Sequence, residues 1–239
     1  NEVLNFYKNL PFNIYGNLDK AVKKIKEVNP LNDYSELKKL IEKFEKSKLI
    51  DVGCGGGWLV NSLAYHLKEN IEVSGIDFNS KVIDYANTIK QKLNLKSNFQ
   101  VSDLFTLNEN KKFDIIVSLG VLHHTNNCHE GIKNLFKLSK KNSYIFLGLY
   151  HKYGREPFLN HFKNLKNQNQ EYKFQVYKEL HQNISDEKKL LSWFRDQVLH
   201  PHETQHTLKE VSAIFKNNNF EIISTSINKF EKFNYLEDL

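Results

Sequence analysis

The sequence contains no methionine, which is unusual at a length of 239 residues, and it has only two cysteines. Cys54 and Cys128 cannot form a disulfide framework, so we expect the chain to work in a reducing compartment, the cytoplasm. The start of the sequence lacks the charged and apolar regions of a secretory signal. No apolar run approaches the ~18 residues that a membrane span requires, so we expect no membrane association.

The composition indicates a globular α/β domain with one main core and room for a cap or insertion. Hydrophobic residues make up 40% of the chain and aromatic residues 13%, which is enough for a large buried interior. The formal net charge of +6 would suit an acidic partner such as nucleic acid. The lysines, however, are scattered among asparagines and form no dense block, so composition does not favour nucleic acid as the partner.

Apolar periodicity predicts helices in the first 46 residues, which we expect to form an N-terminal helical lid over residues 1–46. Turn residues fill the stretch "NLPFNIYGN" over 9–17. The apolar positions recur at helical spacing in two sets: Leu18, Ala21, Val22 and Ile25, then Leu37, Ile41 and Phe44.

From residue 47 to 149, short apolar runs alternate with longer amphipathic stretches. This alternation predicts right-handed crossovers and a doubly wound α/β core with a mainly parallel sheet, whose ligand binds at the carboxyl ends of the strands. The expected strands cover residues 48–52, 71–76, 98–101, 113–118 and 143–149. The expected helices cover residues 58–69, 80–93 and 129–139.

After the fifth strand, we expect a helical insertion over residues 150–205 that lies above the cleft. Residues 206–239 then return to the core with a last helix and strand. Thr207 and Glu210 form a capping-box pattern that places the start of this helix at Thr207. The alternation in Phe220–Ile223 predicts a sixth strand, whereas no clear seventh is found in "KFEKFNYLEDL".

The first strand leads into "DVGCGGGWLV", where Gly53, Gly55 and Gly57 allow close approach of a ligand to the backbone. The second strand ends in Asp77 and the third in "SDLF", so two carboxylates, Asp77 and Asp103, lie at the same cleft. The glycine spacing is G-x-G-x-G, so the G-x-G-x-x-G pattern of NAD-binding turns is not met. No P-loop lysine is present, which disfavours chemistry on nucleotide triphosphates.

These motifs resemble the class I S-adenosylmethionine-dependent methyltransferases. The resemblance covers about residues 45–150 and includes "LIDVGCGGG", "GIDFN", "VSDLF" and "FDIIVSLGVLHHT" in the family's order. It implies a Rossmann-like fold with S-adenosylmethionine as cofactor. The implied cofactor residues are Asp51, Gly53, Gly55 and Gly57 at the methionine part, Asp77 at the ribose, Phe78, Asp103 and Leu104 at the adenine, and Leu119 and Gly120 at the sulfonium.

Members of this family transfer methyl groups to oxygen, carbon or nitrogen, and the fold alone does not determine which of these atoms accepts the methyl group. The loop "SLGVLHHT" is similar to branches that act on small molecules, so we expect a small-molecule acceptor. Two alternatives remain open at this point: an RNA-modifying methyltransferase and a noncatalytic cofactor-binding subunit. Histidine titrates near neutral pH and is therefore suited to remove a proton from the acceptor. The first candidate for this role is His124, followed by His123 and His151.

The acceptor is expected to contact the insertion, where the segment "GLYHKYGR" offers Tyr150, Tyr153 and Arg155. A guanidinium can pair with an acceptor carboxylate or phosphate. We also expect His200, His202, Glu203 and His206 of "HPHETQHT" to line the acceptor pocket, with a scaffolding role as the alternative.

"HETQH" also matches the H-E-x-x-H signature of zinc metalloproteases. That signature needs both histidines on one helical face, and the predicted helix begins only at Thr207, after them. Pro201 further disfavours a helix through the motif. We therefore expect no protease and no metal at this motif, with a metal held by two or three of its loop residues as the minor alternative.

Overall fold

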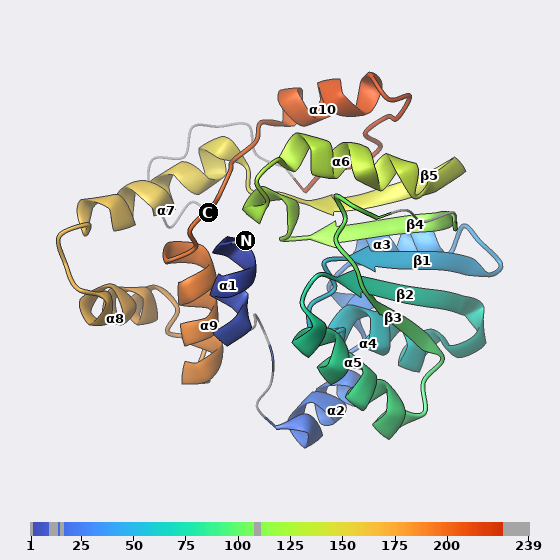
Figure 1. Cartoon of the computed structure of the whole chain (residues 1–239), viewed down its shortest axis with the longest axis horizontal. Helices are drawn as coiled ribbons and strands as arrows, with labels where there is room; N and C mark the ends of the chain where they lie inside the picture. The colour runs from blue at the N-terminus through green and yellow to red at the C-terminus, as the bar shows by residue number, and fades with distance from the viewer. Residues whose placement is uncertain (1, 10–13, 15–16, 108–110, 227–239) are drawn as a thin grey trace.

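A five-stranded, fully parallel sheet forms the centre of the molecule (Figure 1). The structure is a computed structural model that describes residues 2–9, 14, 17–107 and 111–226. The strand order is β3-β2-β1-β4-β5, which confirms the doubly wound α/β fold. The strands are β1 (Ser47–Val52), β2 (Ile71–Asp77), β3 (Ser97–Val101), β4 (Phe113–Leu119) and β5 (Ser139–Gly148).

Helices cover both faces of this sheet. One face packs on α3, α4 and α5, and the other on α6 and α10 (Figure 1). The bounds are α1 (Glu2–Asn9), α2 (Leu18–Glu27), α3 (Ser35–Ile41), α4 (Trp58–Leu67), α5 (Ser80–Leu93), α6 (Cys128–Lys137), α7 (Lys152–Asn164), α8 (Gln170–Leu180), α9 (Glu187–Val198) and α10 (Leu208–Lys216). Three short 3-10 turns are η1 (Pro30–Asn32), η2 (Lys68–Asn70) and η3 (Leu122–His124).

The central strands are apolar on both faces because helices cover each side. Leu49 and Ile115 belong to the core cluster under α3 and α4. Their neighbours Ile50 and Ile116 belong to the cluster under α6 and α10. Successive residues of a strand point to opposite faces, so near-continuous apolar runs are what a buried parallel sheet requires.

The helices α7, α8 and α9 follow β5 and build a separate core. Phe162, Tyr177, Leu190 and Phe194 are its buried members. In Figure 1 the arrowheads of β1 and β4 point towards α9 and α1, so these helices face the carboxyl ends of the strands. The residues after β5 thus stand beside the edge where the sequence places the ligand.

The described helices before β1 have different surroundings, and the lid over residues 1–46 stays a prediction. Ala21 and Ile25 of α2 pack with Ile89 of α5, and Leu37 of α3 is buried in the main core. In contrast, α1 lies against α9 (Figure 1), where the Arg195 Nη2 group donates to the Phe6 carbonyl at 3.2 Å. Most of the expected turn over 9–17 lies outside the described residues.

The expected sixth strand over Phe220–Ile223 is wrong. These residues form no strand, and Ile222 and Ile223 are exposed. The Phe220 ring instead stacks on Phe136 with a centroid distance of 4.6 Å. Because Ile222 and Ile223 remain exposed, the apolar alternation does not form the buried face of a strand. The segment "KFEKFNYLEDL" lies outside the described residues.

The start of the last helix agrees with the sequence prediction. Thr207 is the N-cap of α10 and forms a complete capping box with Glu210. Within the described part of the chain, no helix is both long and apolar enough to cross a membrane.

Candidate active site

The turn after β1 is made of glycines whose backbone is left-handed. The φ angle is +79° at Gly53, +51° at Gly55 and +72° at Gly57. A Cβ atom at Gly53 would lie 2.5 Å from Val121 Cγ2, whereas one at Gly55 would meet no described atom within 4 Å. Gly55 therefore presents bare backbone to open space, which lets a ligand approach closely.

Two buried carboxylates lie next to this turn. Asp77 Oδ2 accepts a hydrogen bond from Gly55 N at 3.0 Å, and Oδ1 accepts one from Asn79 N at 2.9 Å. Burial raises the pKa of Asp77, although these two hydrogen bonds oppose the rise. Burial and the nearby charge of Asp77 raise the pKa of Asp51 to about 7. A cationic ligand at this turn would be favoured because it offsets the repulsion between the two groups.

A cavity of about 370 Å³ opens along the carboxyl ends of β1 to β4, a size within the range of small-molecule sites. One part is lined by Asp77 and Phe78 after β2, and by Asp103 and Leu104 after β3. Val3 of α1 also lines it. The cavity thus brings together Asp77, Phe78, Asp103 and Leu104, whose assignment to the adenosine part of the cofactor stays a prediction.

The wall after β4 differs from the expectation. Val121 and Leu122 line the cavity, whereas the predicted Leu119 and Gly120 are not among its lining residues. Gly120 nevertheless has a φ of +72°, and a Cβ there would meet no described atom within 4 Å. The strand ends at Leu119, and the lining resumes two residues later with Val121 and the first residue of η3.

His123 is buried and holds its proton on one defined nitrogen. Its Nδ1 accepts from Tyr150 N at 3.2 Å, so the neutral ring carries the proton on Nε2. The ring stacks on Tyr150 with a centroid distance of 4.0 Å. Burial, followed by the charges of His124 and Arg155, lowers the pKa of His123 to about 2. This residue is therefore a poor proton acceptor at neutral pH.

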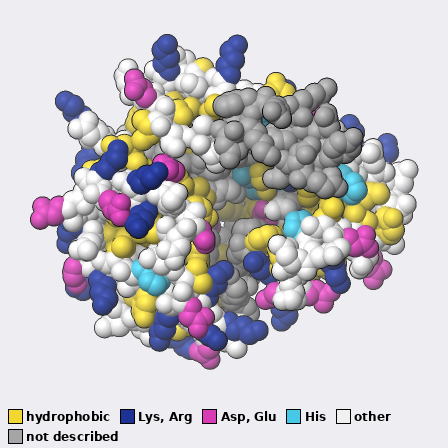
Figure 2. Space-filling model, turned by 180° about the vertical axis from the view of Figure 1, so that it is seen from behind, with side chains coloured by type: hydrophobic (Ala, Val, Ile, Leu, Met, Phe, Trp, Pro, Cys, Tyr) yellow, Lys and Arg dark blue, Asp and Glu magenta, His cyan; other side chains and the backbone are white. Residues whose placement is uncertain are grey.

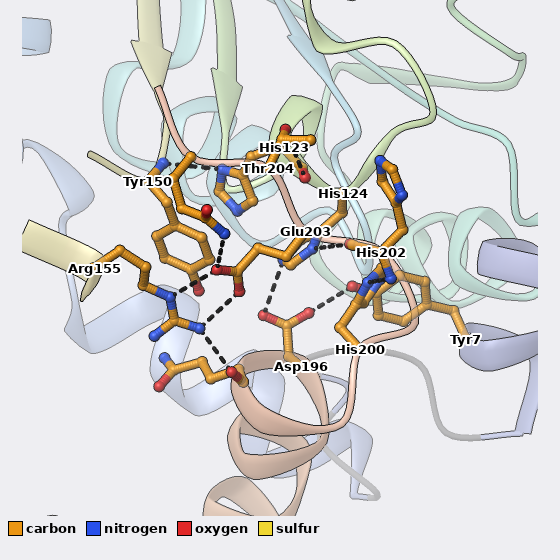
Figure 3. Close-up of polar contacts among 12 residues, drawn as sticks. Tyr7, His123, His124, Tyr150, Arg155, Asp196, His200, His202, Glu203 and Thr204 are labelled. Atoms are coloured by element: carbon orange, nitrogen blue, oxygen red, sulfur yellow. Dashed lines mark hydrogen bonds and ion pairs between the residues drawn. The ribbon is translucent and has the colours of Figure 1, made fainter. Parts of the chain in front are cut away.

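His124 lines the cavity and contacts both α9 of the insertion and the extended chain of residues 199–207, which lies outside the sheet and is called the return strand below (Figure 3). Its Nδ1 lies 3.0 Å from the His202 carbonyl oxygen, which can only accept, so Nδ1 carries a proton. Its Nε2 lies 3.6 Å from Asp196 Oδ2. Asp196 Oδ1 accepts from the Tyr7 hydroxyl at 2.5 Å. Side chains from α1, η3 and α9 thus meet beside the cavity.

Arg155 and Glu203 form a buried ion pair with each other. Arg155 Nε and Nη2 donate to the two carboxylate oxygens of Glu203 at 3.0 and 2.7 Å, and Nη2 also donates to Gln197 O at 2.6 Å. The guanidinium lies over the Tyr150 ring at 4.2 Å. Arg155 and Glu203 thus connect α7 to the chain that follows α9, whereas a role of Tyr150, Arg155 or Glu203 in acceptor binding stays a prediction.

The remaining acceptor-side candidates are spread over different surroundings. His151 Nδ1 accepts from Gly154 N and caps α7, and Tyr153 is 57% exposed. His200 packs on His124 with a centroid distance of 3.9 Å, and its Nδ1 accepts from His202 N. None of these four residues lines the described cavity.

His206 pairs with the chain that follows β5. His206 N donates to Tyr150 O at 2.9 Å, and Lys152 N donates to His206 O at 3.0 Å. The residue is buried in extended chain immediately before α10. The H-E-x-x-H match is therefore not helical, as expected from Pro201 and the cap at Thr207.

Sequence reasoning did not identify Asp196, Tyr7 or Val3. Asp196 is one acid in an amphipathic helix, and nothing local distinguishes it from a surface residue. The only signal for Tyr7 is the aromatic content of "FYKNLPFNIY". Asp196 lies next to His124 and Tyr7 binds Asp196, both across long separations in sequence, and Val3 lines the cavity.

Comparisons with known proteins agree with this site. The family model described as a methyltransferase domain matches residues 43–218. Ubiquinone biosynthesis O-methyltransferases of Pelagibacter ubique and Coxiella burnetii are 35% and 34% identical over 105 and 99 residues. These matches cover 44% and 41% of this chain. The chain spans only 42% and 41% of those relatives' own lengths.

Solved structures share the fold at low sequence identity. The magnesium protoporphyrin IX methyltransferase of Synechocystis with bound SAH is 18% identical, with a TM-score of 0.58, over 96% of this chain and 87% of that one. The plantazolicin methyltransferase with SAH is also 18% identical, with a TM-score of 0.52, over 84% and 66% of the two chains. The chain belongs to the class I S-adenosylmethionine-dependent methyltransferases. S-adenosylmethionine is the cofactor of this family, and the glycine turn with Asp77 and Phe78 fits it.

Proposed function

We propose that the protein transfers the methyl group of S-adenosylmethionine to a hydroxyl group of a small organic molecule. The observation that carries the proposal is a single cavity that has Asp77, Phe78 and Asp103 in one part of its lining and His124 in another. The two free cysteines, both buried, support a cytoplasmic location. The resemblance to ubiquinone biosynthesis O-methyltransferases, which covers 44% of this chain, supports oxygen as the acceptor atom.

The residues at the ends of β2 and β3 would hold the adenosine part of the cofactor. Asp77 presents carboxylate oxygens to the ribose, Phe78 offers a ring to the adenine, and Asp103 offers an acceptor to its amino group. When bound, S-adenosylmethionine supplies an electrophilic methyl group on a cationic sulfur. The protein's task is then to hold the acceptor oxygen close and in line with that methyl group in a site shielded from water.

A hydroxyl acceptor must lose its proton, and the pair of His124 and Asp196 can take it. The carbonyl of His202 fixes the proton on Nδ1, which leaves Nε2, buried and facing Asp196, as the nitrogen that would be protonated. Asp196, 3.6 Å from Nε2, would stabilise the resulting imidazolium. His123 is the weaker candidate because it stays neutral, with its pKa lowered to about 2 by burial. His151, as the cap of α7, has no such position.

The cofactor half of the proposal is tested by calorimetry with S-adenosylmethionine and with SAH. We expect both to bind, and Asp77→Ala to weaken binding at least tenfold, because hydrogen bonds to a charged group contribute roughly 1.5 to 3 kcal/mol each. Asp84→Ala, on the solvent side of α5, is the matched control and should bind normally. Absence of binding by the native chain would overturn the proposal.

The acceptor half is tested with a catechol as hydroxyl probe, an aromatic amine of the same shape, and transfer RNA. We expect methylation of the catechol only, detected as a mass increase together with SAH release. His124→Ala should lower turnover by roughly 10²- to 10⁴-fold, as for other lost general bases, with cofactor affinity unchanged. Preferred methylation of the amine or the RNA would contradict a hydroxyl acceptor while leaving the cofactor site intact.

A further inference from the structure

Three potential metal ligands converge on the side of the molecule where α6 and α10 lie next to each other (Figure 1). They are His129 of α6, His206 of the return strand and Glu210 of α10, and their ligand atoms all lie within 4.8 Å of one another. Glu210 Oε1 is 2.6 Å from His129 Nε2 and 3.4 Å from His206 Nδ1. One carboxylate oxygen therefore faces two imidazole nitrogens.

The hydrogen bonds around His206 determine which of its nitrogens carries the proton. The Thr204 hydroxyl donates its only hydrogen to the His123 carbonyl at 3.2 Å. The Thr204 oxygen must then accept from His206 Nε2, which lies 2.9 Å away. The neutral ring consequently has a bare lone pair on Nδ1. This lone pair points at a carboxylate oxygen, so two acceptors face each other and a cation between them is favoured.

We propose that His129 Nε2, His206 Nδ1 and the Glu210 carboxylate bind a divalent metal ion of the zinc type. Two imidazoles and one carboxylate are a common protein ligand set for zinc with an open fourth position. Ligand atoms around a tetrahedral zinc lie about 3.3 Å apart, given bonds of about 2.0 to 2.1 Å. The gap from His206 already has this size, and the half-exposed His129 has room to move outward.

The other groups of the cluster fit a metal-bound state. Glu210 Oε2 accepts from Thr207 N at 3.3 Å, so the capping box fixes the carboxylate and leaves Oε1 for the ion. His206 Nε2 donates to Thr204, in the manner in which metal-bound histidines usually donate their second N–H. His129 and Glu210 are 46% and 38% exposed, so water can occupy the fourth position.

This site differs from the H-E-x-x-H reading of the same segment. It uses the second histidine of that motif, His206, but takes the carboxylate four residues further along and the other histidine from α6. Through Thr204 it also connects to the backbone of His123 in the cavity loop. A bound ion would therefore tie α6, α10 and the return strand together next to the loop that forms the cavity wall.

The test is titration of chelator-treated full chain with zinc chloride, followed by calorimetry and direct measurement of metal content. We expect one ion per chain and a melting temperature that rises with zinc concentration, because an ion that binds only the folded state stabilises it. Cobalt(II) should give visible absorption bands of a four- or five-coordinate site. These readouts do not depend on methyl transfer, so they separate this proposal from the proposed function.

Matched variants locate the ion. His129→Ala and Glu210→Gln should each weaken zinc binding at least tenfold, and glutamine preserves the capping pattern at this position. Thr204→Val should weaken it by roughly 10- to 100-fold, as for other partners of metal-bound histidine. Lys209→Ala removes an exposed charge of α10 but no ligand, and His161→Ala removes an imidazole of α7. Both controls should keep the zinc affinity of the native chain.

The outcomes are decisive in each direction. Stoichiometric zinc that is lost in both His129→Ala and Glu210→Gln but kept in both controls supports the site. Absence of zinc binding by the native chain overturns it. Binding that persists in the two ligand variants also overturns it, because the ion would then lie elsewhere.

Discussion

The hydroxyl of Tyr7 in α1 donates to the carboxylate of Asp196 in α9 at 2.5 Å. The other oxygen of the same carboxylate lies 3.6 Å from His124 Nε2 beside the cavity. Burial and the charge of Asp196 raise the pKa of Tyr7 above its usual range, so the phenol remains a donor. One buried acid thus joins the N-terminal helix, the insertion and the loop after β4.

We predict that Tyr7→Phe loosens α1 and weakens cofactor binding, because Val3 of the same helix lines the cavity. Loss of a hydrogen bond to a charged group should lower the free energy of unfolding by about 1.5 to 3 kcal/mol. Urea unfolding and calorimetry with SAH measure the two effects. Tyr172→Phe, at an exposed position of α8, is the control. Unchanged stability and affinity in Tyr7→Phe would show that α1 is held by other contacts.

A second prediction concerns the buried pair of Arg155 and Glu203. Removal of either partner, as in Arg155→Met or Glu203→Gln, should lower the free energy of unfolding by roughly 3 to 5 kcal/mol, because the other charge stays buried. The double variant Arg155→Met with Glu203→Leu should be more stable than either single variant. If Arg155 binds an acceptor instead, its removal would raise the acceptor's KM and leave the unfolding curve unchanged.

The glycine turn allows a matched pair of substitutions. Gly55→Ala adds a methyl group in open space, so it should cost about 1 to 2 kcal/mol for left-handed backbone and weaken cofactor binding. Gly53→Ala should destabilise the fold more, because its Cβ would lie 2.5 Å from Val121. Adding Val121→Ala should restore part of the loss in Gly53→Ala. Equal unfolding free energies for the two glycine variants would contradict this assignment.

The fourth prediction is a dependence of stability on pH. Burial and the charge of His124 lower the pKa of His200 from 6.5 to about 4. As the pH falls from 6.5 to 4, His200 is protonated in the unfolded chain but stays neutral in the folded protein. His200 therefore lowers the free energy of unfolding as the solution becomes more acidic. His200→Gln should therefore lose less stability than the native chain between pH 7 and 5. Parallel curves for the two proteins in urea titrations at both pH values would disprove the role of His200.

The sheet could be predicted from sequence because its signals are local. Each strand is a short apolar run, and its burial on both faces requires the helices that the intervening periodicity indicates. The glycine turn and Asp77 follow from the same logic, since the carboxyl ends of parallel strands meet at one edge. The stretch Phe220–Ile223 shows where local patterns fail. Its residues alternate as in a strand, but they form none, because a strand also needs a neighbouring strand and a core to pack against.

The acceptor side depends on contacts that no local pattern contains. Arg155 looks like a free cation in "HKYGREPF" because its partner Glu203 comes many residues later. His124 looks like a free base in the sequence because Asp196, which lies next to it, and Tyr7, which binds Asp196, are both far from it along the chain. Polar residues near a cleft bind either a ligand or one another, and only the arrangement in space distinguishes the two.

The insertion leaves and rejoins the sheet at one place. His206 N donates to Tyr150 O, and Lys152 N donates to His206 O, so a two-rung parallel contact closes the excursion at its base. A segment anchored in this way can change in length and composition without moving the strand ends beneath it. We therefore expect that α7 to α9 could be replaced between these two contacts while the turn at Gly55 stays in place.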